Sequence, residues 1–582
     1  MELTPVLGIL CGVSLLGIVL AAPSHEKVAI VASTLGLLSI FGGIAMLNVE
    51  EIRRPFSLGP SRRWFRYSPL IIALATYVLG SVSPPVTAAA LALGIALLFI
   101  LSRMDNLPKP YVALVASILA GSIAYNVFFY YPVNIGIDSW GYLSTASAIS
   151  KTGHYSNIEQ PTAEYYFPFP VVAIAASTLS IVSTSALPQS LLIFPGVLIL
   201  MQPFLVFLLA RQVFADSQIA SMSACVVLTE SFVTEWIGGP IAQSAALSML
   251  ILLLFMLSRP VTKRSDMVAI FTLFLMVVAM HGSTALVGIL VVYLLITREK
   301  PSHRRMIFTL VVAYLGYLSV SAAIVGITHA GQLSLDQMWR FVLSPFFATG
   351  SEMLTSENGL TFIWWGFPAS LAILSVFVLR YNRQARFWAL LGLVILGLSF
   401  AINIAVPSAD IDRYAGLAAW FILAVAGGKA LRTITGTPRQ LILLAPVLFL
   451  VCASSVVYPF LSPQYGYGQG TFGGVLPTTT SDRIAIDWLS RHGSSDVFAD
   501  VYSASYMVFA RYQSGTFTAE DINRLRVSNL LRLGPESGTR FFRWTDVSAT
   551  YTGRPSCLGV ALALPHNVTN VVYNNSCDIV EA

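Results

Sequence analysis

The chain has 582 residues, of which 56% are hydrophobic and 11% charged, and its mean hydropathy is +0.74. This composition excludes an ordinary water-soluble domain and predicts an integral membrane protein, because so much apolar surface needs a lipid environment. The net charge of +6 comes from bases scattered over predicted loops, which excludes the clustered basic face of a nucleic-acid-binding protein.

Apolar stretches of near-spanning length predict about fifteen membrane helices. The first five cover residues 3–22, 28–47, 69–82, 86–101 and 111–131. The others cover 189–210, 219–235, 241–257, 267–280, 285–296, 307–327, 362–379, 387–405, 415–428 and 441–461. The first stretch lacks a basic segment in front of it and is long enough to span, so we expect it to remain as a helix.

The distribution of charge predicts the orientation of these helices. Of the 25 Lys and Arg residues before position 461, 21 fall in loops that can share one side of the membrane, while 11 of the 18 acids fall in loops on the other side. Because Lys and Arg are retained in the cytoplasm, we expect a multi-pass protein of the plasma membrane with a cytoplasmic N-terminus and an extracytoplasmic C-terminal tail.

Two apolar stretches do not fit simple spans. The stretch 171–186 is rich in Ala, Ser and Thr, and we expect it to lie at or dip into the outer interface. Residues 267–296 are too few for two full spans between two basic loops, so we expect a hairpin of two short helices with His281 at its tip. A single bent helix is the alternative.

The tail, residues 462–582, holds 19 of the 62 charged residues and reads as a small α/β domain. Residues 482–491 and 504–510 have helical patterns, 497–501 resembles a strand, and β-branched runs follow from position 548. Its cysteines, Cys557 and Cys577, form a disulfide if the tail faces an oxidising compartment.

The most informative loop follows the helix that ends near Tyr131 and begins Asn-Ile-Gly-Ile-Asp-Ser-Trp-Gly-Tyr at positions 134–142. Its Asp138 lies just beyond a membrane helix, at the depth of lipid headgroups, where a carboxylate can take a proton from an acceptor hydroxyl while a lipid phosphate leaves. In the alternative reading, Asp138 merely caps a helix that begins at Ser139.

The order of motifs in this loop resembles a known family. Gly-x-Asp-x-Trp-x-Tyr (136–142), a short helix, Lys-x-Gly-His-Tyr (151–155) and an aromatic-Pro-x-Pro run (167–170) are similar to the first external loop of the GT-C superfamily. These polyprenyl-phosphate-dependent membrane glycosyltransferases include protein O-mannosyltransferases, aminoarabinose transferases and the oligosaccharyltransferase catalytic subunit. The resemblance extends from residue 111 to the end and indicates a prokaryotic or archaeal protein.

The resemblance implies a domain organisation and a reaction. It implies a GT-C-like catalytic membrane core at 111–461, with outer loops at 133–188 and 328–360, behind a four-helix N-terminal extension at 1–110. In the family the acidic residue of the first external loop is catalytic, which carries over to Asp138. Some members have an Asp-x-Asp pair there, but here the neighbours are Ile137 and Ser139.

Further polar residues on the predicted outer side are candidates for the same site. Paired acids can hold Mg²⁺ or Mn²⁺, and arginine or histidine can hold a lipid phosphate. The candidate metal ligands are Asp410, Asp412, Glu230 and Glu235, and the candidate phosphate ligands are Arg413, Arg340 and His281. The bland alternatives are a local ion-pair turn, helix-end carboxylates facing water, and an interhelical hydrogen bond.

Aromatic residues and one histidine of the first outer loop are candidate contacts for the sugar or acceptor: Trp140, Tyr142, His154 and Tyr165. They equally suit an interfacial aromatic belt and a solvated loop histidine.

We therefore expect an inverting glycosyltransferase that moves a sugar from a polyprenyl- or dolichyl-phosphate donor to a glycan, lipid or protein acceptor on the extracytoplasmic side. The alternatives are a secondary transporter of lipid or polar solute and a non-catalytic GT-C-like subunit. The first is disfavoured because the acids lie in outer loops rather than at the membrane midplane.

Overall fold

The structure is a computed structural model of the whole chain. The described residues are 3–21, 26–46, 66–79, 84–104, 107–130, 137–154, 169–229, 242–259, 263–281, 284–285, 288, 291, 308–317, 319–320, 359–378, 382–405, 411–465, 497–499, 525–527, 539–543, 571–574 and 578–581.

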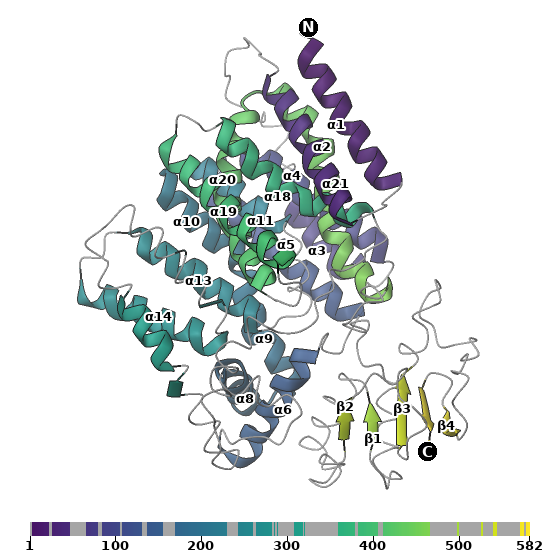
Figure 1. Cartoon of the computed structure of the whole chain (residues 1–582), viewed down its shortest axis with the longest axis vertical. Coiled ribbons are helices and arrows are strands. Elements are labelled where there is room, and N and C mark those ends of the chain that lie inside the picture. Colours follow the sequence, from purple (N-terminus) through teal and green to yellow (C-terminus); the bar gives the residue numbers. More distant parts are fainter. Residues whose placement is uncertain are drawn as a thin grey trace.

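Helices make up the larger part of the described chain (Figure 1). The first eight are α1 (Leu3–Ala21), α2 (Glu26–Met46), α3 (Ser68–Leu79), α4 (Pro84–Ser102), α5 (Lys109–Tyr130), α6 (Ile137–Thr152), α8 (Val171–Ser183) and α9 (Leu187–Leu200). The next eight are α10 (Gln202–Phe214), α11 (Ser217–Leu228), α13 (Ala242–Ser258), α14 (Arg264–Met280), α18 (Gly359–Val378), α19 (Arg383–Ala405), α20 (Ile411–Ile434) and α21 (Pro438–Tyr465).

The helices agree closely with the predicted apolar stretches, with one clear exception. α11 ends at Leu228, whereas the sequence pattern predicts a helix to residue 235. Within the residues whose side chains the structure describes, the run Leu187–Phe214, 28 residues formed by α9 and α10, is long and apolar enough to cross a membrane by itself, and the other apolar runs there have 10–17 residues.

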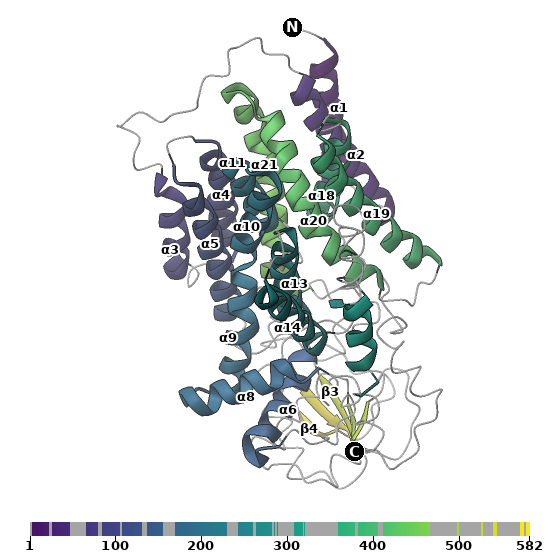
Figure 2. The ribbon, with the colours of Figure 1, turned by 90° about the vertical axis from the view of Figure 1, so that its left-hand side faces the viewer.

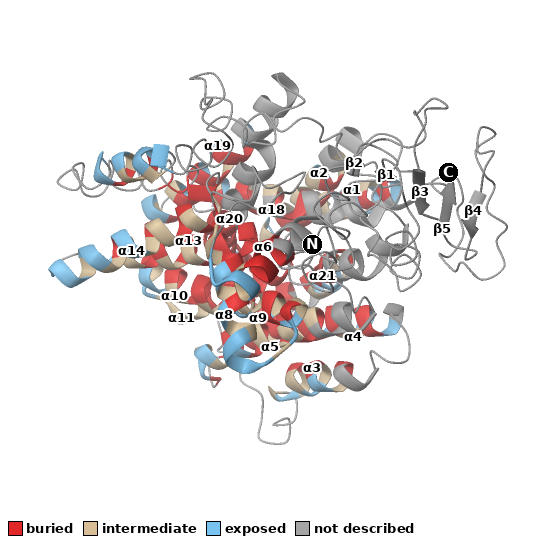
Figure 3. Ribbon diagram, turned by 90° about the horizontal axis from the view of Figure 1, so that it is seen from below, coloured by how far each residue is buried: buried red, intermediate tan, exposed pale blue. Residues whose placement is uncertain are grey.

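The outer surface of the helices is apolar, as expected for a protein in lipid. Large hydrophobic side chains are exposed on α1, α3, α4, α5, α9, α18 and α19, including Leu10 (57%), Ile71 (50%), Leu114 (55%) and Phe377 (69%). Such extensive exposure of apolar side chains is not stable in water, so the helical region faces the hydrocarbon of a membrane. Viewed from below, the buried residues gather in the middle and the exposed ones at the periphery (Figure 3).

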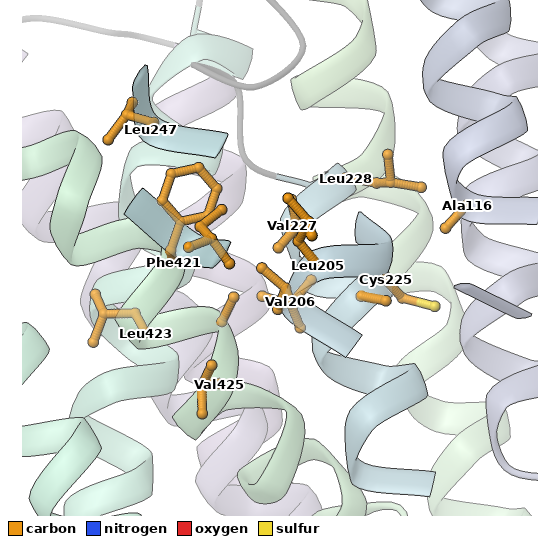
Figure 4. Packing of buried hydrophobic residues seen from close by; sticks show 14 of the residues in the cluster. Ala116, Leu205, Val206, Cys225, Val227, Leu228, Leu247, Phe421, Leu423 and Val425 are labelled. Atoms are coloured by element: carbon orange, nitrogen blue, oxygen red, sulfur yellow. The ribbon is translucent and has the colours of Figure 1, made fainter. Parts of the chain in front are cut away.

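One hydrophobic core joins helices that are far apart in the sequence. It reaches from Leu16 of α1 to Cys452 of α21. In its centre, side chains of α5, α10, α11, α13 and α20 pack together, with Val206 and Val227 among those labelled (Figure 4). Phe41 of α2 meets Phe367 of α18 edge to face, with ring centroids 6.0 Å apart, so the N-terminal helices pack directly on the later ones.

Two glycines allow close helix crossings in this core. A Cβ at Gly428 of α20 would lie 2.6 Å from the Ser223 nitrogen and 2.9 Å from the Ile219 carbonyl oxygen, both on α11. A Cβ at Gly366 of α18 would lie 2.7 Å from the Thr34 nitrogen of α2. No side chain fits at such distances, so both crossings depend on glycine, as in other close contacts between membrane helices.

Several predicted basic loops meet at one end of the bundle, which we call the Arg103 end. Arg103, after α4, donates hydrogen bonds to Gln218 Oε1 (3.2 Å) and to the Gly436 carbonyl (3.4 Å), and thereby joins the starts of α11 and α21. Gln440 Nε2 of α21 donates to the Ile44 carbonyl (3.2 Å), and the Tyr111 hydroxyl donates to the Arg66 carbonyl (3.0 Å). Ala385 of α19 and Ala430 of α20 also pack with Phe214 of α10. Described bases on the elements at this end are Arg66, Arg103, Lys109, Arg211, Arg383, Arg386, Lys429 and Arg432. The contacts therefore agree with the predicted common side of the basic loops.

The opposite end, which we call the α6 end, carries α6 and α8 (Figure 2). α8 has 13 residues and runs across the direction of α9, so it is too short and wrongly inclined to span. It buries Val172, Ala173, Ala176 and Ser177 and exposes Val182 (77%). This is the geometry expected for an interfacial helix.

A five-stranded mixed sheet forms the described part of the tail. Its order is β2-β1-β3-β5-β4, with β1 parallel to β2 and β3, and β5 antiparallel to β3 and β4. The strands are β1 (Val497–Ala499), β2 (Leu525–Val527), β3 (Thr539–Arg543), β4 (Val571–Asn574) and β5 (Asp578–Glu581). β1 agrees with the predicted strand, while both predicted tail helices lie outside the described residues. The sheet lies toward the α6 end of the molecule (Figures 1 and 2).

Candidate functional site

Asp138 lies in the first turn of α6. The helix starts at Ile137, two residues before the start assumed in the capping alternative, so Asp138 is inside the helix rather than in front of it. Its backbone is described, and its side chain lies outside the described part of the structure. Asp138 therefore lies at the N-terminus of a short helix, where the helix dipole favours negative charge.

α6 is fixed firmly in the protein. Leu143 and Ala146 are fully buried in the main core, and Ser150 Oγ lies 2.9 Å from Ser177 Oγ of α8. The helix ends at Thr152 and is followed by Gly153, whose φ of +70° is a conformation that suits glycine and whose N–H donates to the Ile149 carbonyl (2.8 Å). A residue near the start of α6 is thus carried by a packed element rather than by a free loop.

The predicted sugar contacts differ in their surroundings. Tyr142 is only 4% exposed and belongs to the main core. His154 is exposed after the end of α6, and its backbone nitrogen donates to Thr152 Oγ1 (3.1 Å). The Trp140 side chain and the whole of Tyr165 lie outside the described residues.

His281 is the predicted phosphate ligand whose side chain the structure describes. It follows the last residue of α14, and its backbone N–H donates to the Val277 carbonyl (2.9 Å). The Thr284 backbone N–H points to His281 Nδ1 (3.4 Å), and Thr284 Oγ1 lies 2.9 Å from the same atom. A backbone N–H can only donate, so Nδ1 accepts and the proton of the neutral ring is on Nε2.

The same histidine is linked to α8. Its ring centroid lies 6.2 Å from that of Phe169, which immediately precedes Pro170, the N-cap of α8. Because α8 packs on α6, His281 shares the α6 end with the helix that carries Asp138.

Helix length places the start of α20 at this end as well. The other end of α20 leads into Gly436, the partner of Arg103. A helix of 24 residues is about 36 Å long, so its first turn, with Asp412 and Arg413, lies at the opposite side of the bundle. The side chains of Asp412 and Arg413 are not described, and Glu230, Glu235, Arg340 and Asp410 lie wholly outside the described residues.

The hairpin predicted around His281 agrees with the described residues. The helical pattern stops at His281 and resumes at Thr284. A Cβ at Gly288 would lie 2.8 Å from Leu250 Cδ1, in the middle of α13. Since α14 has run the length of α13 by Met280, the contact of Gly288 with the middle of α13 means that the chain has turned back.

A metal site is not visible in the described part of the chain, where no group of three His, Cys, Asp or Glu residues comes together. The predicted metal ligands are among the residues whose side chains are not described. The two cysteines of the predicted disulfide, Cys557 and Cys577, also lie outside the described residues. Among the described cysteines, Cys11, Cys225 and Cys452 form no disulfide.

Two buried polar residues were missed by the sequence reasoning. Gln202 and Gln243 stand within apolar stretches and are each 2% exposed. Amide side chains inside predicted membrane helices were the available signal, since polar groups at that depth are costly.

Comparison with known proteins gives structural similarities only: no family model and no curated protein sequence matches the chain. The oligosaccharyltransferase of Archaeoglobus fulgidus, solved with Zn and sulfate, is similar with a TM-score of 0.43 and 14% identity over 70% of this chain. That match spans 61% of the archaeal protein. ArnT from Cupriavidus metallidurans is similar in its apo state (TM-score 0.35, 12% identity, 80% of this chain and 97% of ArnT) and bound to undecaprenyl phosphate (0.35, 11%, 81% and 97%).

Proposed function

We propose that the protein is a membrane glycosyltransferase that takes a sugar from a polyprenyl- or dolichyl-phosphate donor and transfers it to a glycan, lipid or protein acceptor on the extracytoplasmic side. The observation that supports the proposal is that α6, which carries Asp138, and α14, which His281 follows, both contact α8. The length of α20 puts its start, with Asp412 and Arg413, toward the same end of the bundle. Arg103, a base of a predicted cytoplasmic loop, lies at the other end, where it binds Gln218 and the Gly436 carbonyl.

In the proposed reaction Asp138 acts as general base. The carboxylate takes the proton from the acceptor hydroxyl while the hydroxyl oxygen forms a bond to the anomeric carbon of the sugar. The bond between that carbon and the phosphate oxygen breaks on the opposite face, and the lipid phosphate leaves with the electron pair. Attack from the face opposite the leaving group inverts the anomeric centre.

His281, Arg340 and Arg413 would hold the lipid phosphate. The Nε2 proton of His281 can be donated to a phosphate oxygen, and guanidinium groups bind phosphate through paired hydrogen bonds. Their contribution is positioning and neutralisation of the negative charge on the leaving group. The acid pairs Asp410 with Asp412 and Glu230 with Glu235 are the proposed holders of a divalent cation, which would add to this neutralisation.

The direct test is transfer of labelled sugar from synthetic mannosyl-, glucosyl- and galactosyl-phosphoryl-undecaprenol by the purified protein, with a cell-envelope extract as acceptor. Asp138→Asn should lower the rate at least a hundredfold, the usual contribution of a general base. Asp266→Asn is the matched control, because Asp266 also lies in the first turn of a helix but accepts the Lys263 N–H (3.2 Å) far from the proposed site.

Equal rates for wild type and Asp138→Asn would show that the base is wrongly assigned. Absence of transfer and of lipid-phosphate binding by the wild type would remove the glycosyltransferase proposal altogether and favour the transporter alternative.

A further inference from the structure

Two buried glutamines lie together where α10 and α13 begin. Gln202 is the first residue of α10, and Gln243 is the second residue of α13. Each is 2% exposed, and each has one side-chain amide atom without a hydrogen-bond partner: Oε1 of Gln202 and Nε2 of Gln243. A buried amide atom without a partner costs about 1–3 kcal/mol, so these two atoms point to a group that completes the site.

The orientation of the Gln202 amide follows from its partners. Its Nε2 lies 3.2 Å from the Ser244 carbonyl oxygen and 2.9 Å from Ser248 Oγ. A carbonyl oxygen can only accept, so the nitrogen is on this side and Oε1 is the atom left over. Gln202 therefore offers an acceptor to a ligand that brings an O–H or N–H.

Gln243 lies on the adjoining face of the same helical turn as Ser244. Leu247 and Leu250 follow it at helical spacing, and Leu250 faces Gly288 of the segment after His281. α14 follows α13 after a short connection and packs along it, so α14 runs in the opposite direction and its end at His281 lies near the start of α13. Gln243 is therefore at the depth of His281, on the face of α13 that meets this segment.

The chemistry of the two side chains defines which group each can bind. Both are neutral, and a hydroxyl group suits both, because it can donate to Gln202 Oε1 and can donate to or accept from the amide of Gln243. A phosphate oxygen would suit Gln243 but would face the Gln202 carbonyl oxygen with like polarity. The hydrogen-bond partners of Gln202, the Ser244 carbonyl and Ser248 Oγ, are also uncharged.

We propose that Gln202 and Gln243 form a binding site for hydroxyl groups of the donor sugar, next to the phosphate-binding residue His281. This inference rests on the proposed function and adds to it the part of the site that distinguishes a sugar-bearing lipid from the bare lipid phosphate. The depth shared by Gln243 and His281 makes one ligand able to reach both, with its phosphate at the histidine and its sugar at the amides.

The test measures binding of two kinds of lipid to the purified full-length protein: undecaprenyl phosphate, and the mannosyl-, glucosyl- and galactosyl-phosphoryl-undecaprenols. We expect the wild type to bind at least one glycosylated lipid more tightly than the bare phosphate. Gln243→Met, which keeps the size of the side chain and removes its donor, should weaken binding of that glycosylated lipid about tenfold and leave undecaprenyl phosphate unchanged.

Gln440→Met is the matched control, because Gln440 is a buried glutamine whose amide is fully used. Its Nε2 donates to the Ile44 carbonyl, and its Oε1 accepts from the Thr437 N–H (3.1 Å). Without ligand, Gln440→Met should lower the melting temperature, whereas Gln243→Met should leave it unchanged or raise it, since it removes a donor that has no partner. This contrast distinguishes a ligand site from a purely structural amide.

Unchanged affinity of Gln243→Met for every glycosylated lipid would overturn the inference, and would show that water or the chain itself fills the site. An equal loss of affinity for undecaprenyl phosphate and for the glycosylated lipids would also overturn it, because the two glutamines would then not contact the sugar. In both cases the proposed function stands, whereas a wild type that binds neither kind of lipid removes both.

Discussion

The ring of Phe169 lies 6.2 Å from the ring of His281, centroid to centroid, and their planes are inclined by 32°. This contact joins the segment in front of α8 to the end of α14, which are more than a hundred positions apart in the chain. His281 is held on its other side by Thr284, which approaches Nδ1 through both its hydroxyl and its backbone N–H. The imidazole thus has a defined orientation at the end of the bundle that carries α6.

We expect His281→Asn to weaken binding of undecaprenyl phosphate about tenfold while the protein stays folded. Asparagine keeps a hydrogen-bonding atom near the place of Nδ1 and can still meet Thr284, but it removes the Nε2 donor proposed for the phosphate. Affinity is measured by titration with undecaprenyl phosphate, and the melting temperature reports folding. Unchanged affinity would show that His281 serves only to link the helices.

The two ends of the bundle should react with membrane-impermeant thiol reagents from opposite sides. His154, after α6, and Lys263, before α14, are both exposed and lie in turns. With the native cysteines replaced, His154→Cys should be labelled in intact cells and Lys263→Cys only after the membrane is opened, because we place the basic loops in the cytoplasm. Labelling of both positions from the same side would contradict the proposed orientation.

Gly428→Ala should destabilise the protein by about 1–3 kcal/mol, since the added methyl group meets the backbone of α11 and must force α11 and α20 apart. Gly397→Ala is the control, because Gly397 lies within α19 and a Cβ there would have no neighbour within 4 Å. Alanine at Gly397 is expected to be neutral or slightly stabilising. Thermal unfolding in detergent compares the two, and equal melting temperatures would show that the α11–α20 crossing is not as close as described.

Removal of divalent cations should reduce sugar transfer if the acid pairs Asp410 with Asp412 or Glu230 with Glu235 hold a cation. We expect a chelator to lower the rate of transfer, Mn²⁺ or Mg²⁺ in excess to restore it, and Asp412→Asn to raise the cation concentration needed for half of the maximal rate. Full activity in the presence of chelator would assign charge neutralisation to His281 and the arginines alone.

The sequence by itself determined that the chain is a membrane protein and fixed most helix positions. These properties depend on local apolar length, which can be read along the chain. The separation of basic from acidic loops stays a prediction from the retention of Lys and Arg. The short helix α8 before α9 was also predicted not to span, and its 13 residues agree with that prediction. Asp138 was singled out by its position after a membrane helix and by the motif around it.

Tertiary structure alone decided which residues share a depth and which polar atoms are satisfied. Gln202, Gln243 and Gln440 are alike in the sequence, yet Gln440 uses its whole amide whereas Gln202 and Gln243 each retain one atom without a partner. Likewise, Gly428 and Gly397 differ only in whether another helix passes close by. Hydrogen bonds and close crossings between helices depend on where distant segments meet, and the order of residues along the chain does not contain those distances.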